Sequence, residues 1–252
     1  MKINDKNFKV GAIIQARTGS TRLPNKIFAK IIEKPLLWHI YNRISYSKLI
    51  DNIIIATTDK NEDNIIEEWA NENNILIYRG SENDVLSRFY NAAVENAIDI
   101  IVRITADDPF KDPTLIDEAI SELVNKNLNF VYNNKPPTFP EGLDVEIFDF
   151  NSLKKANNKS TSLFEREHVT QYFFNNLDEF KHLNITSIHN NALLRWTIDT
   201  ASDLEMTEVV YENLYKENQI FLYEDILNLI KQKPQIAKIN INIERSEMYK
   251  NL

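Results

Sequence analysis

Short apolar runs alternate with longer amphipathic segments from residue 9 to about residue 104, and this alternation limits the fold more than any other feature. The apolar runs are nearly continuous and rich in β-branched residues, and they lie at 10–14, 53–57, 75–78 and 100–104. Such runs predict central parallel strands that are covered on both faces. The segments between them, at 36–46, 62–71 and 84–96, carry apolar residues at helical spacing. We therefore expect an α/β fold, with a mostly parallel twisted sheet and helices on both faces.

The rest of the chain is expected to complete the same domain. A helix at 113–125 and a strand at 128–132 precede a break at 133–140 that is rich in Pro and Asn. Beyond the break, 142–148 alternates like a half-buried strand, with Asp144 and Glu146 on one face. The remaining expected elements are a helix at 162–174 that opens with capping-box spacing, a strand at 193–198, a helix capped at 200–203 that ends at 214, and a helical tail from 223. We therefore expect a single domain, 1–252, that consists of two parts, one at about 9–132 and the other at about 133–215.

The loop that leaves the first predicted strand, residues 15–26, is unusually polar and basic. It contains Arg17, Arg22 and Lys26, three hydroxyl side chains, and Gly19, which is one of four glycines in the protein. Glycine lets the backbone approach phosphate oxygens, and cations stabilise a triphosphate and its leaving group. The loop therefore predicts a triphosphate site, with a solvated basic turn as the alternative. No P-loop or G-x-G-x-x-G spacing is present, which disfavours P-loop hydrolases and Rossmann dehydrogenases.

The ends of the other predicted strands share a chemical theme with this loop. They read Thr-Thr-Asp at 57–59, Arg-Gly-Ser at 79–81 and Thr-Ala-Asp-Asp-Pro at 105–109. Ligands of open parallel sheets bind at the carboxyl ends of the strands. With the loop at 15–26, two of the four strand ends are basic and one is acidic. This suits an anionic ligand that is bound with the help of a metal ion.

Composition excludes several classes of protein. The formal charge of −8 argues against binding to nucleic acid or to an anionic membrane, because both need a broad basic face. Any metal must bind to oxygen or imidazole, since the chain has no cysteine. No apolar stretch approaches the roughly 18 residues of a membrane span, and residues 1–5 lack the apolar core of a secretory signal. We expect a cytoplasmic protein that acts on small molecules.

The order of the motifs resembles that of the SpsF-like cytidylyltransferases of spore-coat and surface polysaccharide synthesis, which are relatives of the acylneuraminate and CMP-Kdo synthetases. The motifs are I-I-Q-A-R-T-G-S-T-R-L-P-N-K at 13–26, A-T-T-D at 56–59, R-G-S-E-N-D-V-L at 79–86, V-R-I-T-A-D-D-P at 102–109, F-P-E-G-L-D-V-E at 139–146, E-R-E-H-V-T at 165–170 and W-T-I-D-T at 196–200. Each motif alone is weak, but their shared order is specific.

The resemblance implies a nucleotide-sugar-transferase (GT-A-like) fold and Mg²⁺-dependent transfer of CMP from CTP to a sugar acid or a sugar phosphate, with release of pyrophosphate. The product would be CMP-linked for a sugar acid and CDP-linked for a sugar phosphate. A homodimer is also implied, with the predicted helix at 163–174 as a possible contact. Two alternatives remain open, namely a glycosyltransferase of the same fold and an inactive nucleotide-binding subunit.

Matching positions imply roles for individual residues. Arg17, Arg22, Lys26 and Asp107 would be catalytic, and Asp107 and Asp199 would bind the metal. The nucleotide would be held by Gln15, Ala16, Gly19, Ser20, Thr57, Thr58, Asp59, Arg79, Ser81 and Arg103. The sugar would be held by Glu141, Asp144, Glu146, Arg166 and His168, with His168 as a candidate base. The alternatives are helix capping for Asp107, a purely electrostatic role for Asp199 and a structural role for His168.

The chain departs from the family pattern at two places. Asn25 occupies the position of a usual glycine, and we expect the turn to survive because asparagine tolerates left-handed backbone angles. Asp108 adds a carboxylate where the family more often has Cys or Asn. It would either join the metal site or cap the turn before Pro109.

Overall fold

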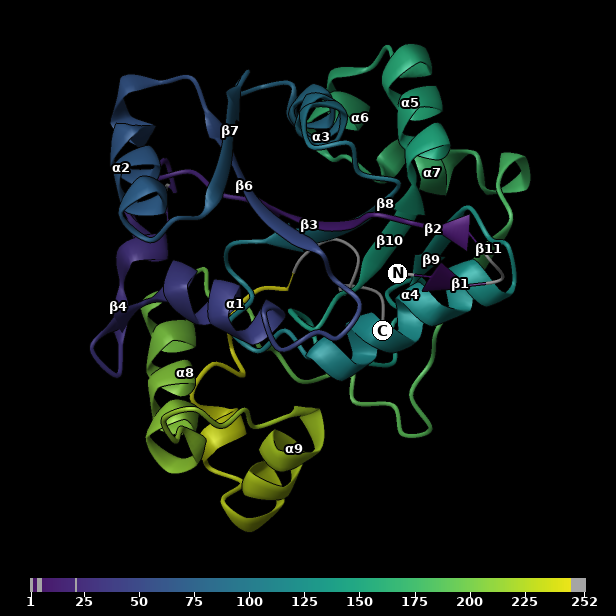
Figure 1. The fold of residues 1–252 in the computed structure, drawn as a ribbon. Helices are drawn as coiled ribbons and strands as arrows, with labels where there is room; N and C mark the ends of the chain where they lie inside the picture. The colour runs from purple at the N-terminus through teal and green to yellow at the C-terminus, as the bar shows by residue number, and fades with distance from the viewer. Residues whose placement is uncertain (1, 4–5, 21, 246–252) are drawn as a thin grey trace.

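The computed structural model of the protein describes residues 2–3, 6–20 and 22–245 (Figure 1). In this part of the chain, seven strands form one sheet in the order β11-β9-β10-β8-β3-β6-β7. They are β3 (Val10–Gln15), β6 (Asn52–Thr58), β7 (Leu76–Gly80), β8 (Ile100–Thr105), β9 (Phe130–Tyr132), β10 (Glu146–Asp149) and β11 (His182–Asn184). Only β10 runs antiparallel to its neighbours in this sheet. The carboxyl ends of β3, β6, β7 and β8 therefore meet at one edge.

Helices cover both faces of the sheet, so the predicted α/β fold is confirmed (Figure 1). One core cluster includes side chains of α1 (Leu36–Ile44), α2 (Asn64–Glu72), α4 (Pro113–Asn125), α8 (Ala201–Leu214) and α9 (Tyr223–Gln232). The other includes side chains of α3 (Val85–Glu95), α5 (Phe150–Lys159) and α7 (Gln171–Asn175), and α6 (Leu163–Glu167) contacts α3 and α7. The shorter elements are β1 (Lys2–Ile3), β2 (Lys6–Asn7), β4 (Lys30–Ile31), β5 (Lys34–Pro35) and the 3-10 turns at Lys26–Phe28, Asn61–Asp63, Leu177–Glu179 and Ile236–Lys238.

Local signals in the sequence place several helices correctly. The helix predicted at 113–125 is α4, and the side chain of Asp112 caps it by accepting from the Thr114 amide at 2.8 Å. The cap predicted at 200–203 is present and is a capping box, in which the side chains of Thr200 and Asp203 each accept from the other residue's amide. No helix in the described ranges combines the length and the apolar character that a membrane span requires.

One predicted strand begins later than expected, and another does not form. The strand expected at 142–148 begins only at Glu146, because the Asn133 side chain binds the backbone before it. This side chain accepts from the Val145 amide at 2.8 Å and donates to the Leu143 carbonyl at 2.9 Å. The fully described segment 193–198 forms a single bridge, between Arg195 and Glu141, and no strand. Its backbone pairs with loops instead of with the sheet.

The helix predicted at 162–174 is interrupted. Its start is correct, since the Ser162 hydroxyl accepts from the Glu165 amide, but α6 ends at Glu167 and α7 begins at Gln171. The turn between them buries Val169 and Thr170, and the Thr170 hydroxyl donates to Glu146 at 3.1 Å. Burial of this turn against β10 thus interrupts the helix that the sequence pattern favours.

Candidate active site

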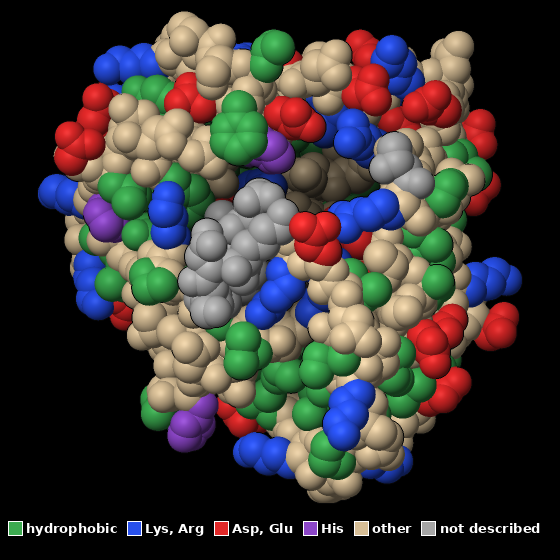
Figure 2. All heavy atoms as spheres, turned by 180° about the vertical axis from the view of Figure 1, so that it is seen from behind, with side chains coloured by type: hydrophobic (Ala, Val, Ile, Leu, Met, Phe, Trp, Pro, Cys, Tyr) green, Lys and Arg blue, Asp and Glu red, His purple; other side chains and the backbone are tan. Residues whose placement is uncertain are grey.

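A cleft of three adjoining cavities follows the carboxyl edge of the sheet. The central cavity, of about 430 Å³, is lined by Gln15, Arg17, Gly19, Ser20, Arg22, Lys26, Ile27, Thr105, Ala106, Asp107, His168 and Asp199. The acidic cavity, of about 190 Å³, is lined by Arg103, Thr105, Asp107, Asp108, Lys111, Glu141, Gly142, Asp144, Glu146, Thr197 and Asp199. The side cavity, of about 210 Å³, is lined by Gln15, Ala16, Arg17, Glu82, Asn83, Val85, Arg88, Glu167 and His168. Shared residues join the cavities, and Figure 2 shows a hollow on the face opposite that of Figure 1 with charged side chains and a histidine at its margin.

A buried aspartate shapes the basic loop of the central cavity. Asp63 accepts hydrogen bonds from the amide and the hydroxyl of Thr18, at 2.8 and 2.7 Å. Asn25 closes the loop by donating from its amide to the Thr18 carbonyl at 3.3 Å. Asn25 has φ 55° and ψ 24°, which confirms the left-handed turn expected of this residue. Thr21 lies outside the described residues.

Lys26 joins the basic loop to both candidate metal ligands. Its ammonium nitrogen lies 3.0 Å from Asp107 Oδ2, 2.9 Å from Asp199 Oδ1 and 2.8 Å from the Ile198 carbonyl oxygen. Burial by itself lowers the pKa of Lys26, but the two carboxylates outweigh it and the pKa is raised. Burial raises the pKa of Asp199, but Lys26, Arg22 and Arg195 together lower it. The structure therefore brings together residues that were predicted from three distant motifs.

Arg195, which does not line the central or the acidic cavity, positions Asp199. Its guanidinium lies 2.8 Å from Asp199 and also pairs with Glu141 at 2.8 Å and Asp203 at 2.9 Å. The side chain is buried, as are those of Glu141 and Asp203. Sequence reasoning missed Arg195, although it is a charge inside the apolar run 193–198, and such a charge indicates a buried partner or a ligand.

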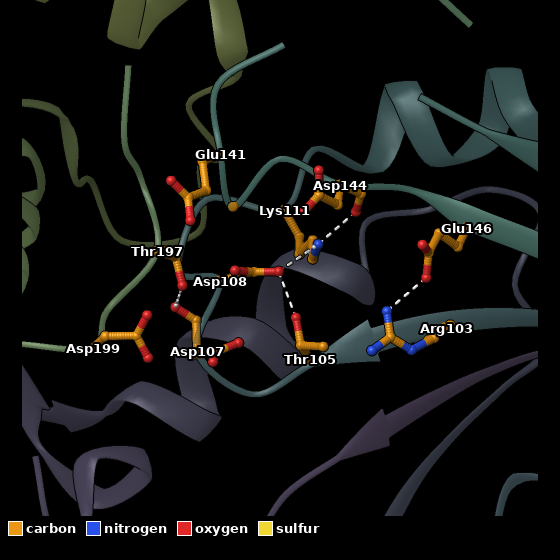
Figure 3. Close-up of a pocket in the computed structure, with 11 residues that line it drawn as sticks. Arg103, Thr105, Asp107, Asp108, Lys111, Glu141, Asp144, Glu146, Thr197 and Asp199 are labelled. Atoms are coloured by element: carbon orange, nitrogen blue, oxygen red, sulfur yellow. Dashed lines mark hydrogen bonds and ion pairs between the residues drawn. The ribbon is translucent and has the colours of Figure 1, made fainter. Parts of the chain in front are cut away.

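Two ion pairs line the acidic cavity (Figure 3). Arg103 lies 2.6 Å from Glu146, and Lys111 lies 2.7 Å from Asp108 and donates to the Asp144 carbonyl. Burial raises the pKa of Asp108, and Lys111 opposes this shift. Arg103, predicted for the nucleotide, thus lines the acidic cavity beside three residues predicted for the sugar. Asp108 pairs with Lys111, a residue that the sequence analysis did not select.

Gly142 is required by the fold of this cavity. Its φ is +98°, and a Cβ atom there would lie 2.7 Å from the Thr197 amide nitrogen and 2.8 Å from the Trp196 carbonyl oxygen. We predict that Gly142→Ala lowers the free energy of unfolding by about 2 kcal/mol or more, measured by urea denaturation. Gly19→Ala is the control, because among the described residues a Cβ at Gly19 would meet Glu62 alone, at 3.7 Å. Equal stability of the two variants would contradict the prediction.

The side cavity lies next to the basic loop. Arg17 and Glu82 face each other across it at 3.6 Å. His168 lies where the side and central cavities meet, its ring centre 4.4 Å from that of Phe164, and burial lowers its pKa. His168 is not among the residues that line the acidic cavity, so its position does not favour the predicted role as base for a sugar hydroxyl.

Several predicted binding residues do not line the cleft. Arg79 pairs with Glu67 at 2.6 Å and donates to two backbone carbonyls, and Arg166 pairs with Asp84 and donates to Asn157. Both guanidiniums are thus directed to partners outside the three cavities. Four further predicted nucleotide residues also do not line the three cavities, namely Thr57, Thr58, Asp59 and Ser81. Thr57 and Thr58 are buried at the end of β6.

Comparison with known proteins identifies the family. The model of the family described as "Cytidylyltransferase" matches residues 11–233. The uncharacterized protein MJ1063 of Methanocaldococcus jannaschii is 38% identical, over 97% of this chain and 99% of its own. The spore coat polysaccharide biosynthesis protein SpsF of Bacillus subtilis is 31% identical over 89% and 95%. A 3-deoxy-manno-octulosonate cytidylyltransferase of Geobacter metallireducens is 29% identical over 83% and 86%.

Solved structures agree with this assignment. A cytidylyltransferase from Leptospira borgpetersenii has a TM-score of 0.88 and 33% identity, over 95% of this chain and 100% of its own. A CMP:2-keto-3-deoxy-manno-octonic acid synthetase, solved with CTP, has a TM-score of 0.61 at 15% identity over 81% and 99%, and this likeness shows the fold alone. The predicted resemblance is therefore confirmed: the chain belongs to the cytidylyltransferase family and is a nucleotidyltransferase.

Proposed function

We propose that the protein is a Mg²⁺-dependent cytidylyltransferase that transfers CMP from CTP to a sugar acid or a sugar phosphate for surface glycan synthesis, with release of pyrophosphate. The observation that carries this proposal is the contact of Lys26 with both Asp107 and Asp199, at 3.0 and 2.9 Å, at the junction of a basic and an acidic cavity. A triphosphate needs the cations of the first cavity, and a polyhydroxylated acceptor suits the carboxylates of the second.

The two aspartates fit a magnesium ion. One oxygen of each lies within 3.0 Å of the same ammonium nitrogen, so their oxygens already converge on a cation. Mg²⁺ favours one or two carboxylates, and substrate phosphates and water complete its ligand shell. When bound, the ion would neutralise phosphate charge.

The cationic side chains of the basic loop would stabilise the negative charge that develops during the transfer. Arg17, Arg22 and Lys26 line the central cavity, where they would orient the phosphates and stabilise the charge on departing pyrophosphate. An acceptor in the acidic cavity would approach the α-phosphorus from the side of Asp107 and Asp199, which both cavities share. In this proposal, residues of 9–132 contribute most of the nucleotide site and residues of 133–215 much of the sugar site.

The acceptor would place its hydroxyl groups against carboxylates. Asp144 and Glu146 line the acidic cavity, and carboxylates accept hydrogen bonds from sugar hydroxyls. Arg166, which the resemblance assigns to the sugar, is bound to Asp84 and Asn157 instead. The names of SpsF and of the 3-deoxy-manno-octulosonate cytidylyltransferase support an acidic sugar of surface polysaccharides.

A mass-spectrometric assay tests the proposed function. The protein is incubated with CTP, Mg²⁺ and a panel of ulosonic acids and sugar phosphates, and in parallel with nucleotide sugars and acceptor sugars. We expect pyrophosphate and a CMP- or CDP-linked sugar from the first panel. Free CMP or CDP from a nucleotide sugar would instead indicate a glycosyltransferase, and no product from either panel an inactive binding subunit.

We also propose a homodimer that uses α6. Leu163 and Phe164 are 82% and 57% exposed there. Burial of such large apolar side chains against a second copy would stabilise a dimer. Sedimentation velocity tests the assembly, and a protein that sediments only as a monomer would refute it.

A further inference from the structure

We infer that Asn240 and Arg245 are positioning residues, which hold Asp199 ready for the metal ion through Arg195. This inference rests on the proposed function, because it takes Asp199 as a ligand of Mg²⁺. Both residues follow residue 233, where the match to the family model ends. They line a cavity of about 180 Å³ together with Arg195, and neither of them lines the central, acidic or side cavity. Any effect on the reaction must therefore pass through other side chains.

The two carboxylate oxygens of Asp199 have different partners. Oδ1 contacts the Lys26 ammonium at 2.9 Å and the Arg22 guanidinium at 3.0 Å, and both of these cations line the central cavity. Oδ2 accepts from the Arg195 guanidinium at 2.8 Å. The Asp199 amide donates to the Asp203 carboxylate at 3.1 Å. Arg195 and Asp203 thus fix the residue so that Oδ1 is the oxygen turned to the cations of the central cavity.

Asn240 holds Arg195 and Asp203 together. It is 3% exposed, and its side-chain nitrogen donates to the Arg195 carbonyl at 3.0 Å and to Asp203 Oδ1 at 2.9 Å. A side-chain amide has two N–H donors, so both are used. The same Oδ1 atom of Asp203 accepts from Arg195 Nε at 2.9 Å. Asp203 is fully buried, so loss of the Asn240 amide would take a donor from a carboxylate at a place where that loss is costly.

Arg245 acts on Arg195 through Glu141. Its Nε lies 3.3 Å from Glu141 Oε2, while Arg195 binds Oε1 of the same carboxylate at 2.8 Å. Arg245 also donates to the Ala192 and Leu194 carbonyls, which ties it to the segment before Arg195. The side chains of Glu141 and Arg195 are buried, so water screens their charges little. By balancing the charge of Glu141, Arg245 lets Arg195 keep its hydrogen bonds to the other two carboxylates.

Isothermal titration calorimetry of CTP, with and without Mg²⁺ and without acceptor, tests the inference. We expect Mg²⁺ to tighten CTP binding by the wild type, and Arg245→Met and Asn240→Leu each to reduce this gain by about 10-fold, because both partners act on a metal-binding carboxylate. In initial-rate titrations, both variants should need about 10-fold more Mg²⁺ for half-maximal turnover and keep kcat at saturating Mg²⁺ near that of the wild type. Arg245→Lys keeps a positive charge beside Glu141 and should restore most of the gain.

Ile236→Ala is the matched control. Ile236 lies in the 3-10 turn Ile236–Lys238, shortly before Asn240, and its apolar side chain is buried in the core. Its truncation should lower the melting temperature, but an alkyl side chain neither donates to the carboxylates nor balances their charge. The gain from Mg²⁺ should therefore stay unchanged. An equal loss of this gain in Ile236→Ala and in the two test variants would assign the effect to a general loosening of the C-terminal segment and refute the inference.

The outcomes separate this inference from the proposed function. If the wild type gains CTP affinity from Mg²⁺ and releases pyrophosphate, but the folded variants keep that gain, positioning by Asn240 and Arg245 is refuted and the function stands. A wild-type protein that gains nothing from Mg²⁺ refutes the metal site together with this inference, and one that binds no CTP refutes the proposed function as well. Thermal melts identify a variant that does not fold. Arg245 is 19% exposed at its side chain, so Arg245→Met is the milder change and then decides.

Discussion

Lys26→Met is expected to lower kcat by about 10²- to 10³-fold and to change the KM of the acceptor little. Lys26 is the cation that contacts both Asp107 and Asp199, and it lines the central cavity but not the acidic one. Its charge would therefore act on the phosphates as pyrophosphate leaves and not on the bound sugar. Steady-state kinetics with saturating CTP measure both quantities. Lys30→Met is the control, because Lys30 is exposed and pairs only weakly, with Glu33 at 3.9 Å.

The same variant should also bind metal differently. In the wild type, the Lys26 ammonium lies where the carboxylate oxygens of Asp107 and Asp199 converge, so it competes with any cation that approaches them. Without nucleotide, Lys26→Met is expected to bind Mn²⁺ more tightly than the wild type does, as measured by electron paramagnetic resonance. In the kinetic experiment, a Lys26→Met protein that loses acceptor binding more than turnover would show that the basic loop only docks the substrate.

Asp107→Asn and Asp199→Asn are each expected to reduce turnover at saturating Mg²⁺ by about 100-fold or more. An amide oxygen carries no net charge, so it holds Mg²⁺ less tightly and leaves the phosphate charge less balanced. Magnesium titrations of the initial rate measure the loss together with the raised metal requirement. Asp178→Asn, at an exposed position on the 3-10 turn Leu177–Glu179, is the control. Near wild-type turnover in both cleft variants would refute the proposed metal site.

Stability should distinguish the two aspartates. Asp107 is 30% exposed at its side chain, and in the described part of the chain its carboxylate forms an ion pair only with Lys26, so Asp107→Asn should melt close to the wild type. Asp199 is 16% exposed and pairs with Lys26, Arg22 and Arg195. Asp199→Asn leaves the buried Arg195 with one partner fewer, and we expect a lower melting temperature for this variant. Thermal melts without ligand measure the difference.

Over residues 10–132 the sequence alone predicted the order of the helices and of the strands of the main sheet, because apolar periodicity and capping residues act locally. It did not predict α5 or β11. The continuous run at 100–104 and the capped segment at 113–125 are β8 and α4. The predictions were wrong where the backbone has a distant partner. Alternation at 142–148 could not reveal that the Asn133 side chain binds this segment, and spacing at 162–174 could not reveal that Thr170 is buried against Glu146.

Tertiary structure decided which charges meet. Lys26 is 81 residues from Asp107 and 173 from Asp199 in sequence, yet one ammonium contacts both. The parallel strands β3 and β8 bring the basic loop and Asp107 to one edge, and the Ile198 amide, which donates to the Asp107 carbonyl, holds the segment before Asp199 against it. The sequence identified these three residues, but it could not tell a cation that faces the cleft from one that is paired elsewhere. Arg79 and Arg166 have carboxylate partners outside the cleft, and Arg88 lines it. Electrostatic pairing depends on distance in space, and only the folded chain sets that distance.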